Sequence, residues 1–345
     1  MSNPSICILP RLEGLGGPIS FQSRLAEGLL ARGYGVHHDP GDPNCIAILV
    51  IGGTNRLWEL WRARRRGVRI VQRLNGMNWL HRKQPTPLLA YLRAERSNLL
   101  LAGIRRLMAD RIVYQSRFAS DWWRTRYRSV RAPGQIIYNG VDLHQYTPQG
   151  SGCPPADRIR LLMVEGRLLS SNRQGLENAV ALANRLSQME EWPVELMVVG
   201  EVSEELKNRY SPAESTPARQ SLIQWIGAVR REEIPQIDRS AHLLFSADLN
   251  AACPNSVIEA LACGLPIVAF ATGSLPELLE GEAGRVVPYG GNYWNLEPPD
   301  IPALAVAAHA ILCDLPRYRQ NARIRAEQVF DVNRMVERYL EVLVG

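Results

Sequence analysis

Short runs of β-branched and aliphatic residues alternate with longer segments of helical periodicity along most of this chain. The first half is expected to hold strands at residues 5–9, 46–51, 68–72, 111–115 and 135–138. Helical patterns lie between them, the longest at residues 87–109. Such alternation predicts an α/β fold, in which right-handed crossovers connect the strands of a parallel sheet and helices cover both of its faces.

The alternation is interrupted once, by a segment rich in proline and glycine at residues 147–156, and then restarts. A chain of 345 residues is also too long for one typical core. We therefore expect two doubly wound, Rossmann-like domains facing across a cleft, where ligands bind at the carboxyl ends of the strands. The expected parts are a first domain (1–146), a linker (147–158), a second domain (159–330) and a last helix (331–345) that packs back on the first domain.

The net charge of +6 is unevenly distributed. Residues 1–150 contain 22 basic and 9 acidic side chains, a charge of +13, whereas the remaining residues carry −7. A basic first half suits an anionic partner, such as a membrane surface or a phosphorylated acceptor, although solvated arginine-rich helices explain it equally well. Aromatic residues are only weakly interleaved with the basic ones, so a nucleic-acid partner is not expected.

Several classes of protein are not expected from the motifs. The sequence has no His-x-x-x-His and no Asp-x-Asp, so we expect no metal site and no cofactor. Its six cysteines include no Cys-x-x-Cys pair and are expected to be reduced thiols. No apolar segment reaches the roughly 18–20 residues of a membrane span, and the start does not resemble a signal peptide. The expected location is the cytoplasm, with peripheral contact at the inner face of a membrane as an option.

The segment at residues 254–270 carries the clearest chemistry. Pro254, Asn255 and Ser256 are typical of a helix start with a capping side chain, and Gly264 is typical of its end. Backbone N–H groups and the helix dipole at that start are suited to bind an anion. Glu259 lies one turn further on, where its carboxylate could accept two hydrogen bonds from the vicinal diol of a ribose. The alternative is that Glu259 is an exposed helix residue.

This segment, with the following residues 271–279, closely resembles the donor-binding region of the family-four retaining glycosyltransferases (glycosyl transferases group 1, with the GT-B fold). Other markers agree in order and spacing along roughly residues 5–285: a glycine loop, an Asn-Gly-Val-Asp turn and a Gly-Arg-Leu (residues 14–17, 139–142 and 166–168). The resemblance implies transfer of a sugar from a nucleotide-diphosphate donor, with the first domain on the acceptor side.

The resemblance also implies roles for single residues. Arg167 would face the diphosphate and stabilise the leaving group, for which a guanidinium is well suited. The family usually has a phosphate-binding lysine a few residues on; Gln174 stands in that position here, and the adjacent Arg173 could supply the charge. Asn255 and Ser256 would contact the phosphates, Glu259 the ribose, and Gly16 and Gly17 would let the first domain approach the donor without a Cβ.

Two positions depart from the family pattern. The family has a second glutamate, against the donor sugar, eight positions before Glu259, where this chain has Ala251; Asp248 and Asn250 are candidate local substitutes. A histidine near the reaction centre is replaced by Asn75, which can hydrogen-bond a sugar hydroxyl but cannot shuttle protons at neutral pH. His81 could take that place, although a lone loop histidine is more often exposed.

The predicted function is therefore metal-independent, retaining glycosyl transfer to an acceptor hydroxyl on a carbohydrate, a lipid-linked sugar or a small molecule, in cell-envelope or polysaccharide synthesis. A catalytically impaired nucleotide-sugar-binding protein of the same fold is the alternative, because Ala251 and Asn75 both lie near the chemistry. A nicotinamide-dependent oxidoreductase would need Gly-x-Gly-x-x-Gly after the first strand, but Ile19 stands where the third glycine belongs.

Overall fold

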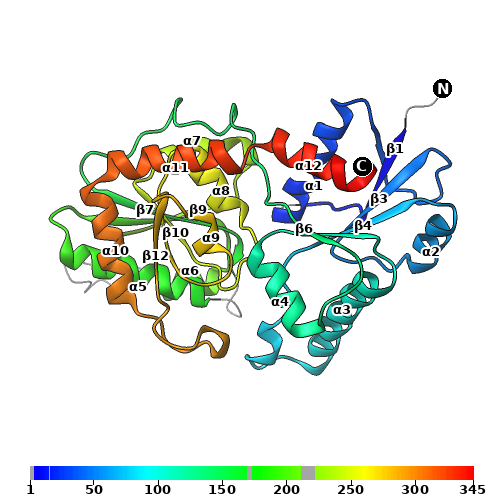
Figure 1. Ribbon diagram of the computed structural model, residues 1–345. Helices are drawn as coiled ribbons and strands as arrows, with labels where there is room; N and C mark the ends of the chain where they lie inside the picture. Colours follow the sequence, from blue (N-terminus) through cyan, green and yellow to red (C-terminus); the bar gives the residue numbers. More distant parts are fainter. Residues whose placement is uncertain (1–3, 15, 169–172, 211–221) are drawn as a thin grey trace. The chain divides into compact units, whose positions relative to one another are not determined.

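The computed structural model describes residues 4–14, 16–168, 173–210 and 222–345. The chain divides into two compact units: unit 1 comprises Met1–Gly140 and Phe330–Gly345, and unit 2 comprises Val141–Val329. Each unit contains one parallel sheet of six strands with helices on both faces (Figure 1). The predicted fold class, two doubly wound Rossmann-like domains, is confirmed.

The strand order of the unit 1 sheet is β2-β1-β3-β4-β5-β6. The strands are β1 (Ser5–Leu9), β2 (Gly35–His37), β3 (Cys45–Ile51), β4 (Arg69–Leu74), β5 (Arg111–Tyr114) and β6 (Gly134–Ile136). The β1, β3 and β4 strands are almost wholly buried, as expected for a parallel sheet that is covered on both faces. The three-residue strand β2 was not expected from the sequence, because Gly-Val-His contains a single aliphatic residue.

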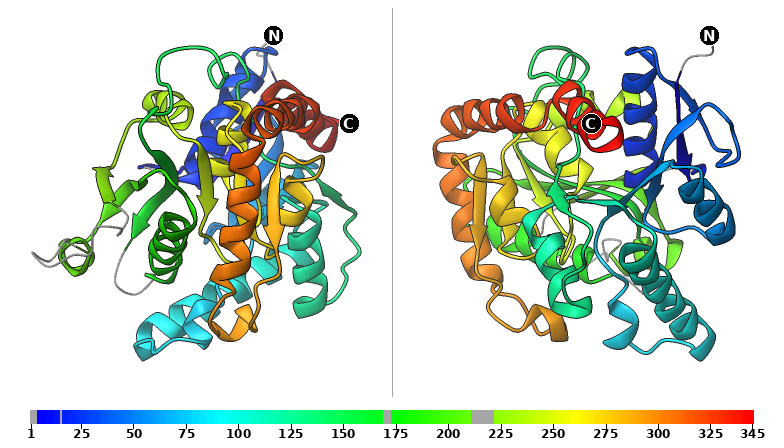
Figure 2. Two further views of the ribbon diagram at one scale, coloured as in Figure 1. Left: turned by 90° about the vertical axis from the view of Figure 1, so that its left-hand side faces the viewer. Right: turned by 45° about the vertical axis from the view of Figure 1, so that its right-hand side comes forward.

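Two layers of helices cover the unit 1 sheet. On one face lie α1 (Gly17–Leu30) and α12 (Val332–Val344), which share a core with β1, β3, β4 and β5. The other face carries α2 (Leu57–Arg65), α3 (Leu88–Leu107) and α4 (Arg117–Tyr127), with the short 3-10 helix η1 (Leu80–Arg82) beside α3. Figure 2 shows this layering of unit 1 from two further directions.

The contact between α1 and α12 is close. An added Cβ at Gly28 would lie 2.4 Å from a methyl carbon of Val336, so only glycine allows the two helices to approach this far. The Asn-Gly-Val-Asp turn holds the same helix: the amide of Gly140 donates to the sulfur of Met335 at 3.1 Å, and the Asn139 side chain accepts from buried Arg73 at 2.7 Å. The first two residues of this turn therefore anchor α12 within unit 1.

Unit 2 has the strand order β12-β11-β10-β7-β8-β9. The strands are β7 (Ile159–Leu168), β8 (Val194–Val202), β9 (Leu222–Gly227), β10 (Leu243–Ser246), β11 (Ile267–Phe270) and β12 (Gly284–Val287). Its helices are α5 (Gln174–Met189), α6 (Glu204–Arg209), α7 (Ile234–Arg239), α8 (Asn255–Ala262), α9 (Leu275–Leu278), α10 (Ile301–Cys313) and α11 (Leu315–Val329), with η3 (Arg231–Glu233) and η4 (Tyr293–Asn295). One core joins α5 and α10 to the sheet, and α8 packs against α7 and α11.

The order of strands in unit 2 fixes where a ligand can bind. Strand β7 comes first along the chain; β8 and β9 are added on one side of it and β10, β11 and β12 on the other. The carboxyl ends of β7 and β10 therefore flank the topological switch point, where the connections leave in opposite directions and open a crevice. No helix in the described parts of either unit is long and apolar enough to cross a membrane.

Candidate functional site

The switch point of unit 2 brings together three of the predicted donor-binding segments. The end of β7 carries Glu165, Gly166 and Arg167, and the loop after β10 leads directly into α8. Pairing of Leu244 with Leu162 sets β10 beside β7, so both segments reach the same edge of the sheet. The N-terminus of α5 reaches this edge too, because an added Cβ at Gly175 would lie 2.9 Å from the side chain of Ala247.

The end of β7 is bulged and passes very close to β8. The pairing of β7 with β8 changes register between Val164 and Arg167, where the strand carries an extra residue. A Cβ at Gly200 would lie 1.9 Å from the carbonyl oxygen of Glu165, and Gly200 has a φ of 134°. Only glycine is compatible with that contact. The bulge sets the direction in which Arg167 leaves the sheet.

Arg167 and Arg173 are both exposed at this edge, and each has an acidic neighbour. A guanidinium nitrogen of Arg167 lies 3.2 Å from a Glu201 carboxylate oxygen, and Arg173 lies 2.9 Å from Glu177, one helical turn away. Exposed pairs of this kind contribute little to stability and exchange partners readily. Both guanidiniums are thus available at the surface to an anion that competes with these carboxylates. The segment between them (169–172) lies outside the described residues, while Gln174 is the first residue of α5.

Helix α8 begins at Asn255, directly after the proline. Its N-cap is Pro254, so Asn255 and Ser256 are the first two helical residues, and no side chain caps this helix start. The predicted capping by Asn255 or Ser256 was wrong, because the proline fixes an extended backbone at the residue where the chain enters the helix. The N-cap residue thus has no side chain to cap the first turn, whose amides lie where the N-terminus of a helix binds an anion.

Glu259 is buried, with 7% of its surface exposed, so it is not an exposed helix residue. Every residue from Val257 to Ala262 is buried with it. Behind it lies Asp238 of α7, which is 1% exposed; burial raises the pKa of Asp238 well above its usual range, and the charge of Glu259 raises it further. A second acidic residue therefore lies close enough to Glu259 for the two to interact.

The loop that carries Ala251 contains buried polar atoms. Asn250 is 4% exposed, has a left-handed backbone with a φ of 60°, and neither its amide nitrogen nor its amide oxygen has a hydrogen-bond partner among the described residues. The hydroxyls of Thr272 and Ser274 share that condition, and the amide of Ser274 donates to the carbonyl of Ala251 at 2.9 Å. Unsatisfied buried polar groups of this kind require a ligand or ordered water. Sequence reasoning found Asn250 but missed the two hydroxyls.

Acidic residues also face the switch point. Burial raises the pKa of Glu165 well above its usual range, and the charge of Asp248, at the end of the neighbouring strand, adds to the shift. A raised pKa favours the neutral carboxylic acid. Within the described residues no group of three or more His, Cys, Asp or Glu side chains is arranged to hold a metal ion.

Gly16, Gly17 and Asn75 lie in unit 1 and are considered there alone. Gly16 is the N-cap of α1, has a φ of 131°, and has open space where a Cβ would project; Gly17 starts the helix. Asn75 directly follows β4, and its carbonyl accepts a hydrogen bond from the indole of Trp123 at 2.7 Å. His81 had been expected to be exposed, and this was wrong. Its side chain is 7% exposed and lies 2.7 Å from Glu95 of α3.

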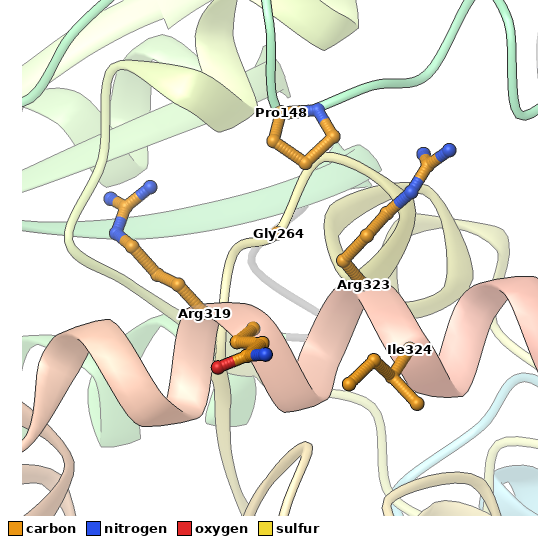
Figure 3. Close-up of a pocket in the computed structure, with 6 residues that line it drawn as sticks. Pro148, Gly264, Arg319, Arg323 and Ile324 are labelled. Atoms are coloured by element: carbon orange, nitrogen blue, oxygen red, sulfur yellow. The ribbon is translucent and has the colours of Figure 1, made fainter.

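A separate, shallow pocket of about 260 Å³ lies in unit 2 at the opposite end of α8, beside Gly264 and Pro148 (Figure 3). Arg319 and Arg323 rise from α11 on its two sides. Their guanidiniums donate to backbone carbonyls, that of Arg319 to Ala241 at 2.6 Å and that of Arg323 to Ala262 at 2.8 Å. These arginines thus link α11 to the segment after α7 and to the last residue of α8. The pocket is not part of the switch-point site.

Part of unit 2 matches a known protein family. Residues 159–314 match the model of the family described as glycosyl transferases group 1. That range contains the end of β7, the loop after β10 and the whole of α8. The resemblance drawn from the motifs is therefore confirmed for unit 2. No curated protein matches the sequence.

Solved structures confirm the GT-B fold. Sucrose-phosphate synthase from Thermosynechococcus elongatus is similar with a TM-score of 0.72 and 19% identity, covering 99% of this chain and 98% of that one. WaaG, a glycosyltransferase involved in lipopolysaccharide biosynthesis, has a TM-score of 0.70 at 16% identity, with coverage of 99% and 100%. Anabaena HepE, in complex with UDP and glucose, has a TM-score of 0.69 at 18% identity, with coverage of 98% and 99%.

Proposed function

We propose that this chain, whose residues 159–314 form a glycosyl transferases group 1 domain, binds a nucleotide-diphosphate sugar at the switch point of unit 2 and transfers the sugar. The observation that carries the proposal is the combination of an uncapped helix start at α8 with buried Glu259 one turn inside it. A helix start binds the phosphates of such a donor, and a carboxylate one turn further on accepts hydrogen bonds from the ribose diol.

In this proposal the phosphates are bound by fixed positive groups. The amides at Asn255 and Ser256 lie at the positive end of the helix dipole, and Arg167 and Arg173 reach the same edge from β7 and α5. As the bond between the sugar and the diphosphate breaks, negative charge grows on the leaving oxygen, and these groups stabilise it. The raised pKa of Glu165 favours its neutral form, which would lessen the negative charge beside the diphosphate.

The donor sugar would lie against the loop around Ala251. The family glutamate is absent there, but the buried amide of Asn250 lies next to that position and has both a donor and an acceptor to offer. Asn75 of unit 1 is proposed to contact the sugar near the reaction centre, and Gly16 and Gly17 to leave room for the donor. We propose retention of the anomeric configuration because the motifs resemble those of the family-four retaining enzymes, and transfer without metal because arginines and amides meet the leaving-group charge.

The proposed acceptor is a hydroxyl on a carbohydrate, a lipid-linked sugar or a small molecule, and the proposed setting is cell-envelope or polysaccharide synthesis. In support, two structural neighbours are a glycosyltransferase of lipopolysaccharide biosynthesis and a protein in complex with UDP and glucose. We further propose a cytoplasmic location with peripheral contact to an anionic membrane, in keeping with the charge of +13 on residues 1–150.

Calorimetric titration with nucleotide-sugars tests the donor site. Glu259→Gln should weaken donor binding by about 10- to 100-fold, because a hydrogen bond to a charged group contributes roughly 1.5–3 kcal/mol. The matched control is Glu195→Gln, which removes another buried glutamate (5% exposed) at the amino end of β8, away from the switch point. It should lower stability and leave donor affinity unchanged. Equal donor affinities for Glu259→Gln and the unmodified protein would refute the proposed site.

Catalysis is tested separately from binding. Arg167→Ala should lower donor turnover while the protein remains folded, and the anomeric configuration of the product distinguishes retention from inversion. Tight donor binding with neither transfer nor hydrolysis would favour the alternative, a nucleotide-sugar-binding protein without activity.

A further inference from the structure

Helix α3 of unit 1 exposes an unusual number of leucines to solvent. Its 20 residues span about 30 Å, and leucines lie on its solvent side, with exposed fractions between 53% and 78%: Leu88, Leu89, Leu92, Leu99 and Leu107. Its inner side packs Ile104 into the core and also buries two polar residues, Asn98 at 1% and Arg105 at 2% exposed. Those buried groups are satisfied within unit 1: Asn98 bonds the backbone of Asn78, and Arg105 the hydroxyl of Tyr114. These contacts fix the side of α3 that faces the sheet and leave the five leucines on its solvent side.

Helix α2 adds tryptophans to the same side of unit 1. Trp58 and Trp61 are 65% and 40% exposed and stack on each other at 4.7 Å, and the Arg65 guanidinium lies 4.7 Å over the ring of Trp61. Helices α2 and α3 pack on one face of the sheet through a shared core, and Arg64 donates to the carbonyl of Leu107 at 2.8 Å. Helices α2 and α3, whose positions Figure 1 shows, thus carry exposed apolar residues on the same side of the sheet. We call this set the leucine–tryptophan face: Trp58, Trp61, Leu88, Leu89, Leu92, Leu99 and Leu107.

The charges around this face are almost all positive. Exposed arginines lie between its apolar residues: Arg62, Arg65, Arg93, Arg96 and Arg106. Helix α2 has one acidic residue, Glu59, which bonds Arg56 at 2.7 Å. The single acidic residue of α3 is Glu95, and hydrogen bonds from Arg82 and His81 lower its pKa to about 2. The acidic residues of both helices are therefore already paired.

We propose that the leucine–tryptophan face docks on an anionic lipid bilayer, with the leucines in the acyl boundary, the tryptophans at the headgroup level and the arginines on lipid phosphates. A second copy of the chain fits poorly. A symmetric interface would place this face against itself, arginine against arginine, and neither helix has an unpaired carboxylate to offset the repulsion. A bilayer supplies both the apolar volume and the negative charge.

This inference deepens the membrane contact proposed above and does not depend on the sugar chemistry. Docking would hold unit 1, the proposed acceptor side, against the surface where a lipid-linked acceptor lies. Vesicle binding and donor binding are measured separately, so either proposal can fail alone.

Co-sedimentation with vesicles tests the docking. The full chain should sediment with vesicles of equimolar phosphatidylcholine and phosphatidylglycerol, less so at high salt, and only weakly with pure phosphatidylcholine. The double variant Leu89→Glu/Leu92→Glu should lose binding, and Arg96→Gln should weaken it about fivefold on the mixed vesicles. Two matched controls in unit 2, Val306→Glu and Trp192→Ala, change residues that are 59% and 55% exposed and should bind as the unmodified protein does.

Three results would overturn the proposal. The first is failure to bind the mixed vesicles; the second is unchanged binding by the double variant. The third is a lipid-free dimer, seen by sedimentation velocity, that the double variant dissociates, since that would assign the face to a second copy. Circular dichroism of the double variant confirms folding, which exposed substitutions should leave intact.

Discussion

The pH dependence of stability offers a sharp test of the buried acidic pair behind the donor site. Asp238 is 1% exposed, and its pKa in the folded protein is raised by burial first and by the charge of Glu259 second. In the unfolded chain the pKa of an aspartate is about 3.9. Between these two values the folded state binds more protons than the unfolded state, so the free energy of unfolding falls as pH rises. The contribution of Asp238 to the free energy of unfolding is fully present below its pKa in the unfolded chain. It is lost as pH rises through its pKa in the folded protein.

Asp238→Asn removes this titration and leaves a neutral side chain of nearly the same shape. Its stability relative to the unmodified protein should rise by about 1.4 kcal/mol per pH unit from about pH 4 upward, and level off at the folded pKa of Asp238. Urea unfolding of both proteins at a series of pH values measures the difference, and exposed Asp314→Asn controls for the substitution itself. When both proteins also carry Glu259→Gln, the pH at which the stability difference stops rising should be lower, because the charge of Glu259 no longer raises the pKa of Asp238. A stability difference that does not change with pH would refute the reasoning.

Two further substitutions test single contacts. Gly28→Ala should destabilise the protein by about 1–3 kcal/mol through overpacking, because its Cβ would lie 2.4 Å from Val336, and Val336→Ala should remove most of that loss; additive effects in urea unfolding would contradict the contact. Cys313 is exposed, with its sulfur 3.4 Å from His309, and should be alkylated by iodoacetamide faster than exposed Cys153. His309→Ala should abolish this difference in alkylation rate. Equal rates for Cys313 and Cys153 in the unmodified protein would count against activation of the Cys313 thiol by His309.

The parallel sheets could be predicted from the sequence because their strands are buried on both faces. Strand β3 (Cys45–Ile51) is an almost continuous aliphatic run, and such runs separated by helical periods specify few other folds. The strands β2 (Gly35–His37) and β12 (Gly284–Val287) were missed, since Gly-Val-His and Gly-Arg-Val-Val contain no more than two aliphatic residues each. Their pairing depends on the strand beside them, which is a long-range contact.

The orientation of a helix was harder to predict than its existence. The pattern at 87–109 predicts helix α3, but a leucine-rich pattern alone favours burial of the leucines. In the structure the deciding contacts are those of Asn98 and Arg105, whose partners lie elsewhere in the sequence. His81 was misjudged for the same reason, because its partner Glu95 is fourteen residues away along the chain.

The two departures from the family pattern have different structural consequences. Beside Ala251, where a glutamate side chain is absent, the structure contains the buried amide of Asn250 and the hydroxyls of Thr272 and Ser274, none of which has a hydrogen-bond partner among the described residues. An amide offers both a donor and an acceptor, whereas a glutamate carboxylate only accepts, so a sugar hydroxyl held here would be bound without a negative charge. If this loop binds the donor sugar, Asn250→Ala should weaken binding of the nucleotide-sugar while leaving that of the nucleoside diphosphate unchanged. Equal losses for both ligands would place Asn250 outside the sugar site and make the amide a structural feature of the loop.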